Sequence, residues 1–419
     1  MASMGEVKPD TGEAYLDIVW KQFKKNRFAL GALWALIPVA LTALLAPLLA
    51  SDQPLVYFEG DQILFPWLLA LFNPTERVDF AFNMAMLAFG PWAIIAWYLN
   101  RRWRQHQVPG RTRALRVTGL LILMVVATIL LFSIPAVRPS NPHSHRAFVE
   151  EEFRDPDAWG IYALSPYGPR DQERGSTFRP PMYRKDATDR QRSSEWFPHL
   201  LGTDDIGRDV LARMIYGTRI SLTIGFLAVG IYLSIGIILG ALAGYFGGLT
   251  DMVISRVIEV ILLFPSFFLI LTLVAMLGPS IYIIMVVIGL TGWPGIARLI
   301  RGEVLKQRSN DYVAAARALG GSHLRVLFRH ILPNALAPAL VAAPFGVASA
   351  IVVEAGLSLL GFGVRLPTPT WGILLRLGSE NYNYWWLIVV PSVAIFFTVT
   401  VFNLIGSGLR DAMDPRLRM

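Results

Sequence analysis

DYVAAARALGGSHLRVLFRHILP, residues 311–333, is a polar segment between two long apolar stretches of this 419-residue chain. The Ser-Asn-Asp run at 309–311 can cap a first helix at its start. Gly320 and Gly321 can supply the left-handed conformation on which helices commonly end, and Ser322 can cap a second helix. The pattern therefore predicts two short helices joined by a glycine turn, where another protein could bind them.

The predicted second helix has two faces. Its apolar residues recur at helical spacing, at Leu324, Leu327, Phe328 and Ile331. Arg325 and Arg329 fall on the opposite side. The apolar face can pack on the rest of the chain or fill a groove in a partner, while the arginines face water or partner carboxylates. The alternative is an ordinary interfacial connection between two membrane spans.

The composition indicates a membrane protein. Hydrophobic residues make up 54% of the chain and charged residues 16%, which is too few charges for the surface of a soluble protein of this length. The net charge of +8 does not indicate nucleic acid as a partner, because the arginines cluster at the ends of apolar runs, as the positive-inside rule describes. The absence of cysteine excludes disulfides, thiolate catalysis and Cys-ligated metals.

Eight apolar runs reach the roughly 20 residues that a helix needs to cross a bilayer. They are residues 28–50, 80–99, 117–137, 221–245, 253–277, 281–300, 335–360 and 387–409. The first follows a lysine-rich stretch and is too long for a cleaved signal peptide, so we expect it to remain as a span with a cytoplasmic N-terminus. The fourth can pack closely on a neighbour through Gly225, Gly230, Gly236, Gly240 and Gly244.

Charge orients these spans. Residues 100–116 carry six arginines, which marks this connection as cytoplasmic, whereas residues 51–79 carry five acidic residues against one arginine. Counting spans from there places the 311–333 segment and the tail in the cytoplasm. The long segment from residue 138 is then external, and its composition predicts an irregular domain or lid. Residues 63–72 are apolar but too short to span, so we expect them at the interface or under the loop.

Four stretches resemble one family of membrane proteins. The 311–333 segment is similar to the cytoplasmic coupling loop of ABC-importer permeases, and five of its residues match that pattern in spacing: Ala315, Ala316, Gly320, Leu332 and Pro333. Ala314 stands where the family has Glu, and His330 where it has Ile. HLLGTDDIGRDVLARMIYGTRISLTIG (199–225), GYFGGLTD (244–251) and GFGVRLPTPTWG (361–372) resemble the oligopeptide/dipeptide branch. The resemblance covers about residues 196–416.

The resemblance implies an all-α, polytopic fold in a bacterial inner membrane. It is the type I ABC-importer transmembrane domain of five core helices, here preceded by three N-terminal spans. We divide the chain at 1–137 (N-terminal spans, with an inserted helical hairpin at 80–137), 138–215 (an extracytoplasmic segment), 216–410 (the core, with the coupling loop at 301–334) and 411–419 (a cytoplasmic tail). The implied function is a permease subunit of an ATP-driven importer for di- or oligopeptides.

The implied partners are a second permease subunit, two ATPase subunits, an extracytoplasmic peptide-binding protein and membrane lipid. ATP and Mg belong to the ATPase subunits, so we expect no cofactor, metal or enzymatic activity on this chain. The stretch GTDDIGRD at 202–209 mimics a phosphate loop, but Arg208 and Asp209 stand where Lys and Ser or Thr are required. We expect Asp204 or Asp205 to cap a helix here, and Arg208, Asp209 and Arg213 to form exposed ion pairs.

The residues implied in coupling to the ATPases are Ala315, Ala316, Arg317, Gly320, Gly321, Leu324, Leu327, Phe328 and Pro333. Glu354, a carboxyl within the seventh span, is a candidate residue of the translocation pathway, with an interfacial helix cap as the alternative. Arg256 and Glu259 lie three residues apart in the fifth span and are expected to pair with each other.

Other functions fit parts of the pattern. A metal-ion importer of the same branch would look alike, because the delivery protein largely selects the substrate. A secondary transporter would show internal repeats and proton relays, and an intramembrane enzyme a catalytic constellation; neither is visible in the sequence. His143 and His145 are a weak hint of an external metal site, since no third ligand follows at a suitable spacing.

Overall fold

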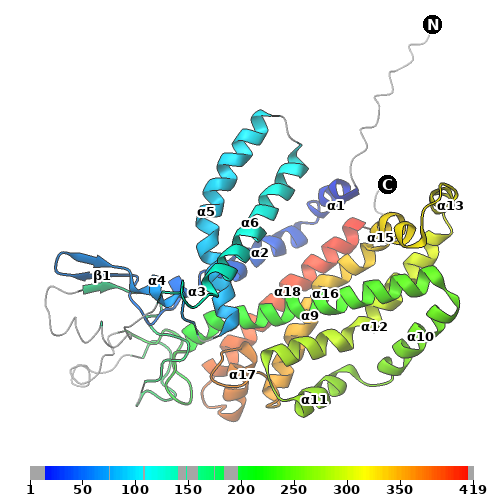
Figure 1. Cartoon of the computed structure of the whole chain (residues 1–419). Coiled ribbons are helices and arrows are strands. Elements are labelled where there is room, and N and C mark those ends of the chain that lie inside the picture. The colour runs from blue at the N-terminus through cyan, green and yellow to red at the C-terminus, as the bar shows by residue number, and fades with distance from the viewer. Residues whose placement is uncertain are drawn as a thin grey trace, which may run out of the picture.

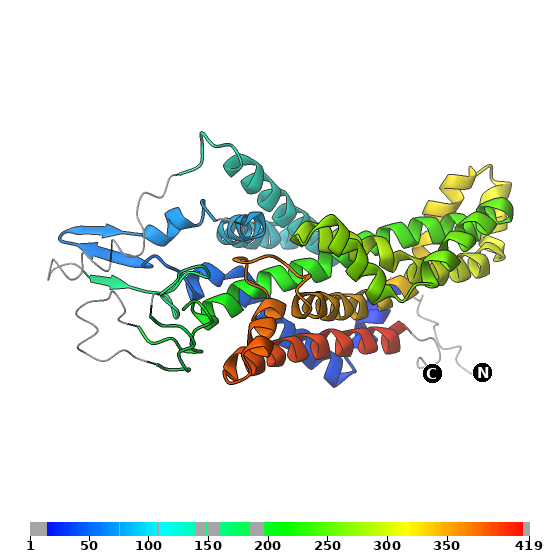
Figure 2. The same cartoon turned by 90° about the horizontal axis from the view of Figure 1, so that it is seen from below.

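The computed structural model describes residues 15–74, 76–106, 109–139, 148, 159–173, 175–183 and 197–413. Most of these residues are helical, and the long helices of the bundle run from one end of the molecule towards the other (Figure 1). A small sheet and irregular loops lie at one end, which we call the sheet end. The short helices of the 311–333 segment lie at the other, the loop end, together with the first helix and the last turns of the final one (Figures 1 and 2).

Seven helices in the described residues are long and apolar enough to cross a membrane. They are α2 (Arg27–Leu44), α5 (Arg77–Gln105), α6 (Gly110–Phe132), α9 (Val210–Phe246), α12 (Ile281–Arg308), α16 (Ala337–Leu359) and α18 (Trp386–Met413). The run at 253–277, predicted as one span, is instead a pair of helices, α10 (Gly248–Leu262) and α11 (Ser266–Leu277), bent by 84°. Pro265 explains the break, because proline lacks a backbone N–H and disfavours helical backbone in the residue before it.

The core of the bundle consists of α9, the α10–α11 pair, α12, α16 and α18. α9 and α12 lie side by side with little space between their backbones (Figure 1). A Cβ atom added at Gly236, Gly240 or Gly244 would lie 2.7, 2.4 and 2.8 Å from atoms of α12. The predicted close packing is therefore confirmed at these three glycines, because larger residues would force the two helices apart. Gly230, in contrast, has no atom of another residue close to that position.

The predicted helical hairpin forms as α5 and α6, which stand away from the bundle (Figure 1). Its base is tied to the core by Arg219 of α9, a side chain with no exposed surface. Arg219 donates to Asp79 (3.2 Å) and Asn83 (2.9 Å) of α5, and to the backbone oxygen of Ala43 in α2 (2.6 Å). This buried arginine thus joins three of the long helices at one point.

The sheet end contains structure that the all-α prediction missed. Three short strands, β1 (Val56–Glu59), β2 (Gln62–Leu64) and β3 (Trp159–Ile161), pair antiparallel in the order β2-β1-β3. Short helices α3 (Ala46–Leu49) and α4 (Pro66–Ala70) lie next to them in the chain, so the apolar run at 63–72 forms a strand end and a helix.

The described ends of the chain lie together at the loop end. Val19 and Phe23 of α1 (Tyr15–Phe23) pack against Ala412 of α18. Asn26 caps α2 by accepting the N–H of Ala29 at 3.1 Å, and its Nδ2 donates to Asp411 at 3.1 Å. The remaining short helices are α13 (Asp311–Ala318), α14 (His323–Arg325), the π-helix η1 (Val326–Ile331), α15 (Leu332–Ala335) and α17 (Trp371–Glu380).

Candidate functional site

The turn of the 311–333 segment has the conformation that its glycines predicted. α13 ends at Ala318, and Gly320, two residues further on, has a φ of +80°. The Gly320 N–H donates to the Arg317 oxygen (2.9 Å) and the Gly321 N–H to the Ala316 oxygen (3.1 Å). This pair of hydrogen bonds is the Schellman arrangement, which satisfies carbonyls at the end of a helix. The predicted side-chain caps at Asn310 and Ser322 are not formed, so that part of the prediction was wrong.

The second half of the segment is a π-helix, and this changes which residues are buried. Val326, Leu327 and Ile331 are fully buried, whereas Leu324 and Phe328 are 58% and 44% exposed. In a π-helix residues five apart are aligned, so Val326 and Ile331 share one side. Pro333 accounts for the wider turn, because it cannot donate a hydrogen bond back to Arg329. The predicted apolar stripe was therefore wrong: Val326 belongs to the buried side, and Leu324 and Phe328 do not.

The loop is held against the end of α9 by Tyr245. The Arg317 guanidinium lies over the Tyr245 ring, 5.3 Å from its centroid. The Tyr245 hydroxyl is 3.1 Å from His323 Nδ1. Val313, on the inner side of α13, is buried. The loop is thus fastened at both of its short helices to the same helix end, and Arg317 is used in this contact.

The outer surface of the loop is exposed and partly apolar. Leu319, next to the glycine turn, is 89% exposed, and Leu324 and Phe328 continue the apolar surface. Ala315 and Pro333 are exposed as well. We call Leu319, Leu324 and Phe328 the exposed loop face. Large apolar side chains gathered on a fixed polar turn are typical of a protein interaction site.

The acidic residue of the seventh predicted span is sealed inside the bundle. Glu354 has no exposed surface, and the Ser358 hydroxyl donates to its Oε1 at 2.8 Å. It lines none of the cavities described below, and its place on a translocation pathway stays a prediction. Arg256 and Glu259 form the expected pair at 2.8 Å, with both side chains exposed.

Most of the stretch at 202–209 is buried, with Ile206 exposed and Asp205 half-buried, contrary to the expected exposed ion pairs. Arg208 Nε lies 2.6 Å and Arg213 Nε 3.5 Å from the same oxygen of Asp204, and none of the three side chains is exposed. Glu173, Phe178 and Arg179 make backbone hydrogen bonds to this turn, which the sequence did not reveal. The helix cap is Asp209, which accepts the N–H of Ala212 at 2.7 Å, and so neither Asp204 nor Asp205 caps the helix.

A second buried ionic cluster adjoins this turn and was not predicted. His199 Nε2 lies 2.7 Å from Glu173 Oε2, and Nδ1 lies 2.9 Å from Asp209 Oδ2. Burial disfavours the charged ring, but the hydrogen bonds to Asp209 and Glu173 outweigh it and raise the pKa of His199 to about 9. His199 is therefore protonated at neutral pH and fastens the segment around Glu173 to the start of α9. His143 and His145 lie outside the described residues.

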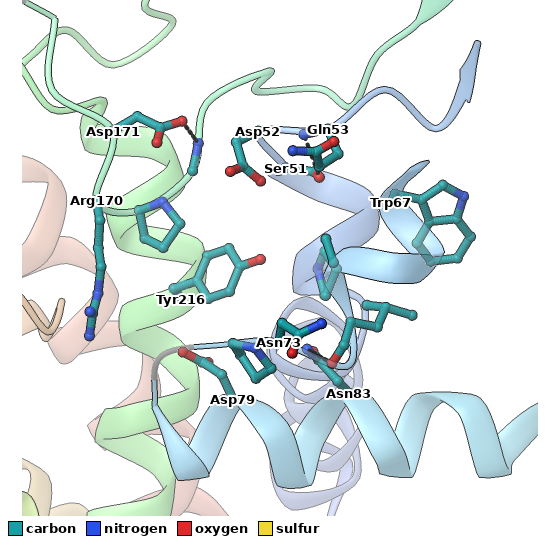
Figure 3. Close-up of a pocket in the computed structure, with 16 residues that line it drawn as sticks. Ser51, Asp52, Gln53, Trp67, Asn73, Asp79, Asn83, Arg170, Asp171 and Tyr216 are labelled. Carbon is teal, nitrogen blue, oxygen red and sulfur yellow. Dashed lines mark hydrogen bonds between the residues drawn. The ribbon is translucent and has the colours of Figure 1, made fainter. Parts of the chain in front are cut away.

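A polar cavity of about 220 Å³ lies at the sheet end, beside the base of α5 (Figure 3). Tyr216 of α9 lies between Asp79 on one side and Asp52 on the other, and Asp171 stands at the same edge as Asp52. Burial, together with the negative charge of Asp171, raises the pKa of Asp52 to about 7. The cavity walls come from separate segments of the chain, which is why no local motif indicated it.

Five core helices, one of them broken, with a fixed and exposed helix–turn–helix loop between the third and the fourth, define a transmembrane subunit of a transport system. Comparison with known proteins is more specific. The chain belongs to the family described as binding-protein-dependent transport system inner membrane components, whose model matches residues 236–419. The N-terminal TM domain of oligopeptide transport permease C matches residues 14–74.

Several curated relatives are similar over most of their own length. The dipeptide transport system permease protein DppC of Escherichia coli K12 is 43% identical over 256 residues, which cover 61% of this chain and 83% of the relative. DppC of Alkalihalophilus pseudofirmus is 42% identical (52% and 73% covered), and the oligopeptide permease OppC of Bacillus subtilis 40% (52% and 72%). The hairpin α5–α6 falls in the stretch between the two family matches.

Among solved structures, the inward-facing MetNI methionine ABC transporter is similar, at 16% identity and a TM-score of 0.41. The match covers 48% of this chain and 96% of that one. The family and the apolar helices make this chain a multi-pass membrane subunit of an ABC transport system.

Proposed function

We propose that this chain is one of two permease subunits in an ATP-driven importer for di- and oligopeptides. The peptide permeases among its relatives support the substrate class. In this proposal the chain lies in a bacterial inner membrane, the loop end with both termini is cytoplasmic, and the sheet end is external. The positive residues before α2 and in the α5–α6 connection support that orientation.

The exposed loop face is the observation that carries the coupling role. Leu319, Leu324 and Phe328 enter a groove of an ATPase subunit, while buried Leu327 and the turn at Gly320–Gly321 hold them in place. Arg317 acts through its contact with Tyr245. Because the loop is fastened to α9, a displacement of the loop by the ATPase moves a helix of the core.

The other parts of the reaction belong to partner chains. Two ATPase subunits bind ATP and Mg, a second permease subunit completes the pathway, and an external binding protein delivers the peptide at the sheet end. ATP binding and release then favour different arrangements of the two permeases, and differential binding selects between them. This chain does not hydrolyse ATP, since its one phosphate-loop mimic lacks the required Lys and Ser or Thr.

A charge placed on the exposed loop face tests the proposal. In the reconstituted complex, Leu324→Glu should lower both ATP-driven uptake of radiolabelled Ala-Ala and co-purification of the ATPase subunits about tenfold, because a carboxylate would be buried at the interface. The matched control for ATPase co-purification is Leu164→Glu at the sheet end, where the leucine is 63% exposed against 58% for Leu324. Uptake and assembly at the wild-type level in Leu324→Glu would contradict the docking face. A wild-type complex that takes up no peptide would contradict the importer itself.

A further inference from the structure

The described residues 197–413 contain a second cavity, of about 350 Å³, among α9, α11, α12 and α16. We call it the mid-span pocket, because its residues lie near the middle of α9, α12 and α16. Its lining includes four hydroxyl-bearing side chains and no charged one: Tyr232, Ser266, Thr291 and Ser349. The rest of its wall is glycine and aliphatic. The volume is at the lower end of the range found for small-molecule sites.

Tyr232 is built into the wall of this pocket by two glycines. A Cβ atom at Gly292 would lie 3.0 Å from the Tyr232 ring, and one at Gly346 only 1.4 Å from its hydroxyl. Tyr232 is 8% exposed, and its hydroxyl has no hydrogen-bond partner among the described residues. A buried phenol normally finds a partner, because leaving it unpaired is unfavourable. An unpaired hydroxyl on a cavity wall therefore points to a ligand that supplies the bond.

The break between α10 and α11 opens onto the same pocket. Ser266, the first residue of α11, lines it, and no side chain caps the N–H groups of that first turn. Non-helical backbone within a membrane is tolerated where it is buried in protein or lines an aqueous cavity. Broken helices at substrate sites supply their free backbone groups to the ligand. The same pocket thus has two sources of hydrogen bonds, the uncapped N–H groups at the start of α11 and the Tyr232 hydroxyl.

We infer that the mid-span pocket is the part of the peptide pathway contributed by this chain, and that Tyr232 hydrogen-bonds the peptide backbone there; this rests on the proposed function. Hydroxyls and backbone N–H groups can bond to amides whatever side chains the peptide carries. The absence of charge in the lining means that acidic and basic peptides are neither held nor repelled by a fixed charge. The ligand class is therefore a short peptide recognised by its main chain.

The substitution Tyr232→Phe removes the hydroxyl and keeps the ring between its glycines. In the complete importer reconstituted with its partner subunits, we expect uptake of radiolabelled Ala-Ala, Ala-Lys and Ala-Glu to fall by a similar factor, roughly two- to tenfold for one lost hydrogen bond. ATP turnover stimulated by the binding protein should persist. Uptake at the wild-type rate, or a loss confined to one of the charged peptides, would overturn the inference.

A labelling experiment checks whether the pocket is open to water, independently of Tyr232. The chain has no native cysteine, so Ser349→Cys is a unique thiol at the exposed side of the pocket. A charged, membrane-impermeant thiol reagent should modify this cysteine and block peptide uptake. Excess Ala-Ala should slow the modification. The matched control is Ser234→Cys on α9, an exposed serine that does not line the pocket.

The two outcomes separate the two proposals. If the wild-type complex imports Ala-Ala but Ser349→Cys reacts no faster than Ser234→Cys and peptide gives no protection, the pocket assignment is wrong and the importer stands. If the wild-type complex imports no peptide, the proposed importer function is wrong, and the assignment of the pocket to a peptide pathway is wrong as well.

Discussion

Replacing Gly320 tests the backbone conformation that the loop requires without disturbing how its side chains pack. A Cβ atom at Gly320 would meet no other residue, so a larger side chain fits in space. The φ of +80° is what a larger residue resists. At Gly321 the situation is reversed: its φ is not positive, but a Cβ atom there would lie 2.7 Å from the Ala316 oxygen that accepts its own N–H. Gly320 is therefore required for its backbone conformation and Gly321 for the space around it.

The size of the effect follows from the left-handed conformation. An ordinary residue there is destabilised by about 1–2 kcal/mol, and a β-branched residue by more. Since 1.4 kcal/mol is a factor of ten, Gly320→Ala should shift the turn about five- to thirtyfold towards open forms, and Gly320→Val further. Asn tolerates this conformation, so Gly320→Asn should stay close to the wild type. Opening the turn moves Leu319 and Leu324 of the exposed loop face.

Uptake, complex pull-down and ATP turnover measured on one membrane preparation test this. We expect Gly320→Asn to lower uptake least, Gly320→Ala more and Gly320→Val most. The amount of the chain in the membrane should stay unchanged, because the long helices lie outside the loop. If Gly320→Val transports at the wild-type rate in an intact complex, the segment is a passive connector and the coupling role is refuted. If Asn and Val are equally impaired, the loss does not arise from the backbone conformation.

Four further outcomes are expected. Because the pKa of His199 is raised from 6.5 to about 9, the stabilisation that its charge gives the fold is complete below about pH 6.5 and is lost as the pH rises through 9. Thermal unfolding in detergent should show a pH-dependent loss of up to about 3 kcal/mol of folding stability, and His199→Gln should abolish this dependence. A variant with the same pH profile as the wild type would contradict this. Arg219→Gln should destabilise the chain by about 3–5 kcal/mol by leaving Asp79 buried without its partner, and an unaltered melting temperature would count against this. Single cysteines within residues 100–116 should be labelled from the cytoplasm only, and external labelling would reverse the hairpin. Tyr245→Ala should raise the number of ATP molecules hydrolysed per peptide imported by several-fold, and an unchanged ratio would argue against transmission through this residue.

The sequence predicted well those features that depend on local properties. The length of an apolar run is local, and seven of the eight spans form as long helices at the expected places. The left-handed turn at Gly320 is local as well. The straight helix at 253–277 failed because Pro265 was given too little weight against the apolar run. The apolar stripe failed because it assumed an α-helical period where Pro333 follows a π-helix.

The buried ionic contacts could not be predicted, because their partners are far apart in the chain. Arg219 and Asp79 are 140 residues apart, and nothing near either residue indicates the other. His199 reads as one histidine in a polar loop until Glu173 is folded over it. For the same reason Arg208 was expected on the surface. A charged residue in a loop is normally exposed, and Arg208 is buried only because a distant segment of the chain folds over it.

α9 connects the three parts of the molecule that the proposals concern. Asp209 caps it at the sheet end within the His199 cluster, Tyr232 lies on its pocket side, and Tyr245 holds the loop at its other end. It has no proline, whereas α12 contains Pro294, and its glycines pack it closely against α12, so a movement of α9 should carry α12 with it. A displacement of the loop would then reach the pocket wall through α9, on which Tyr232 lies. The number of ATP molecules hydrolysed per peptide imported by Tyr245→Ala tests this transmission, since Tyr245 does not line the pocket and is itself buried.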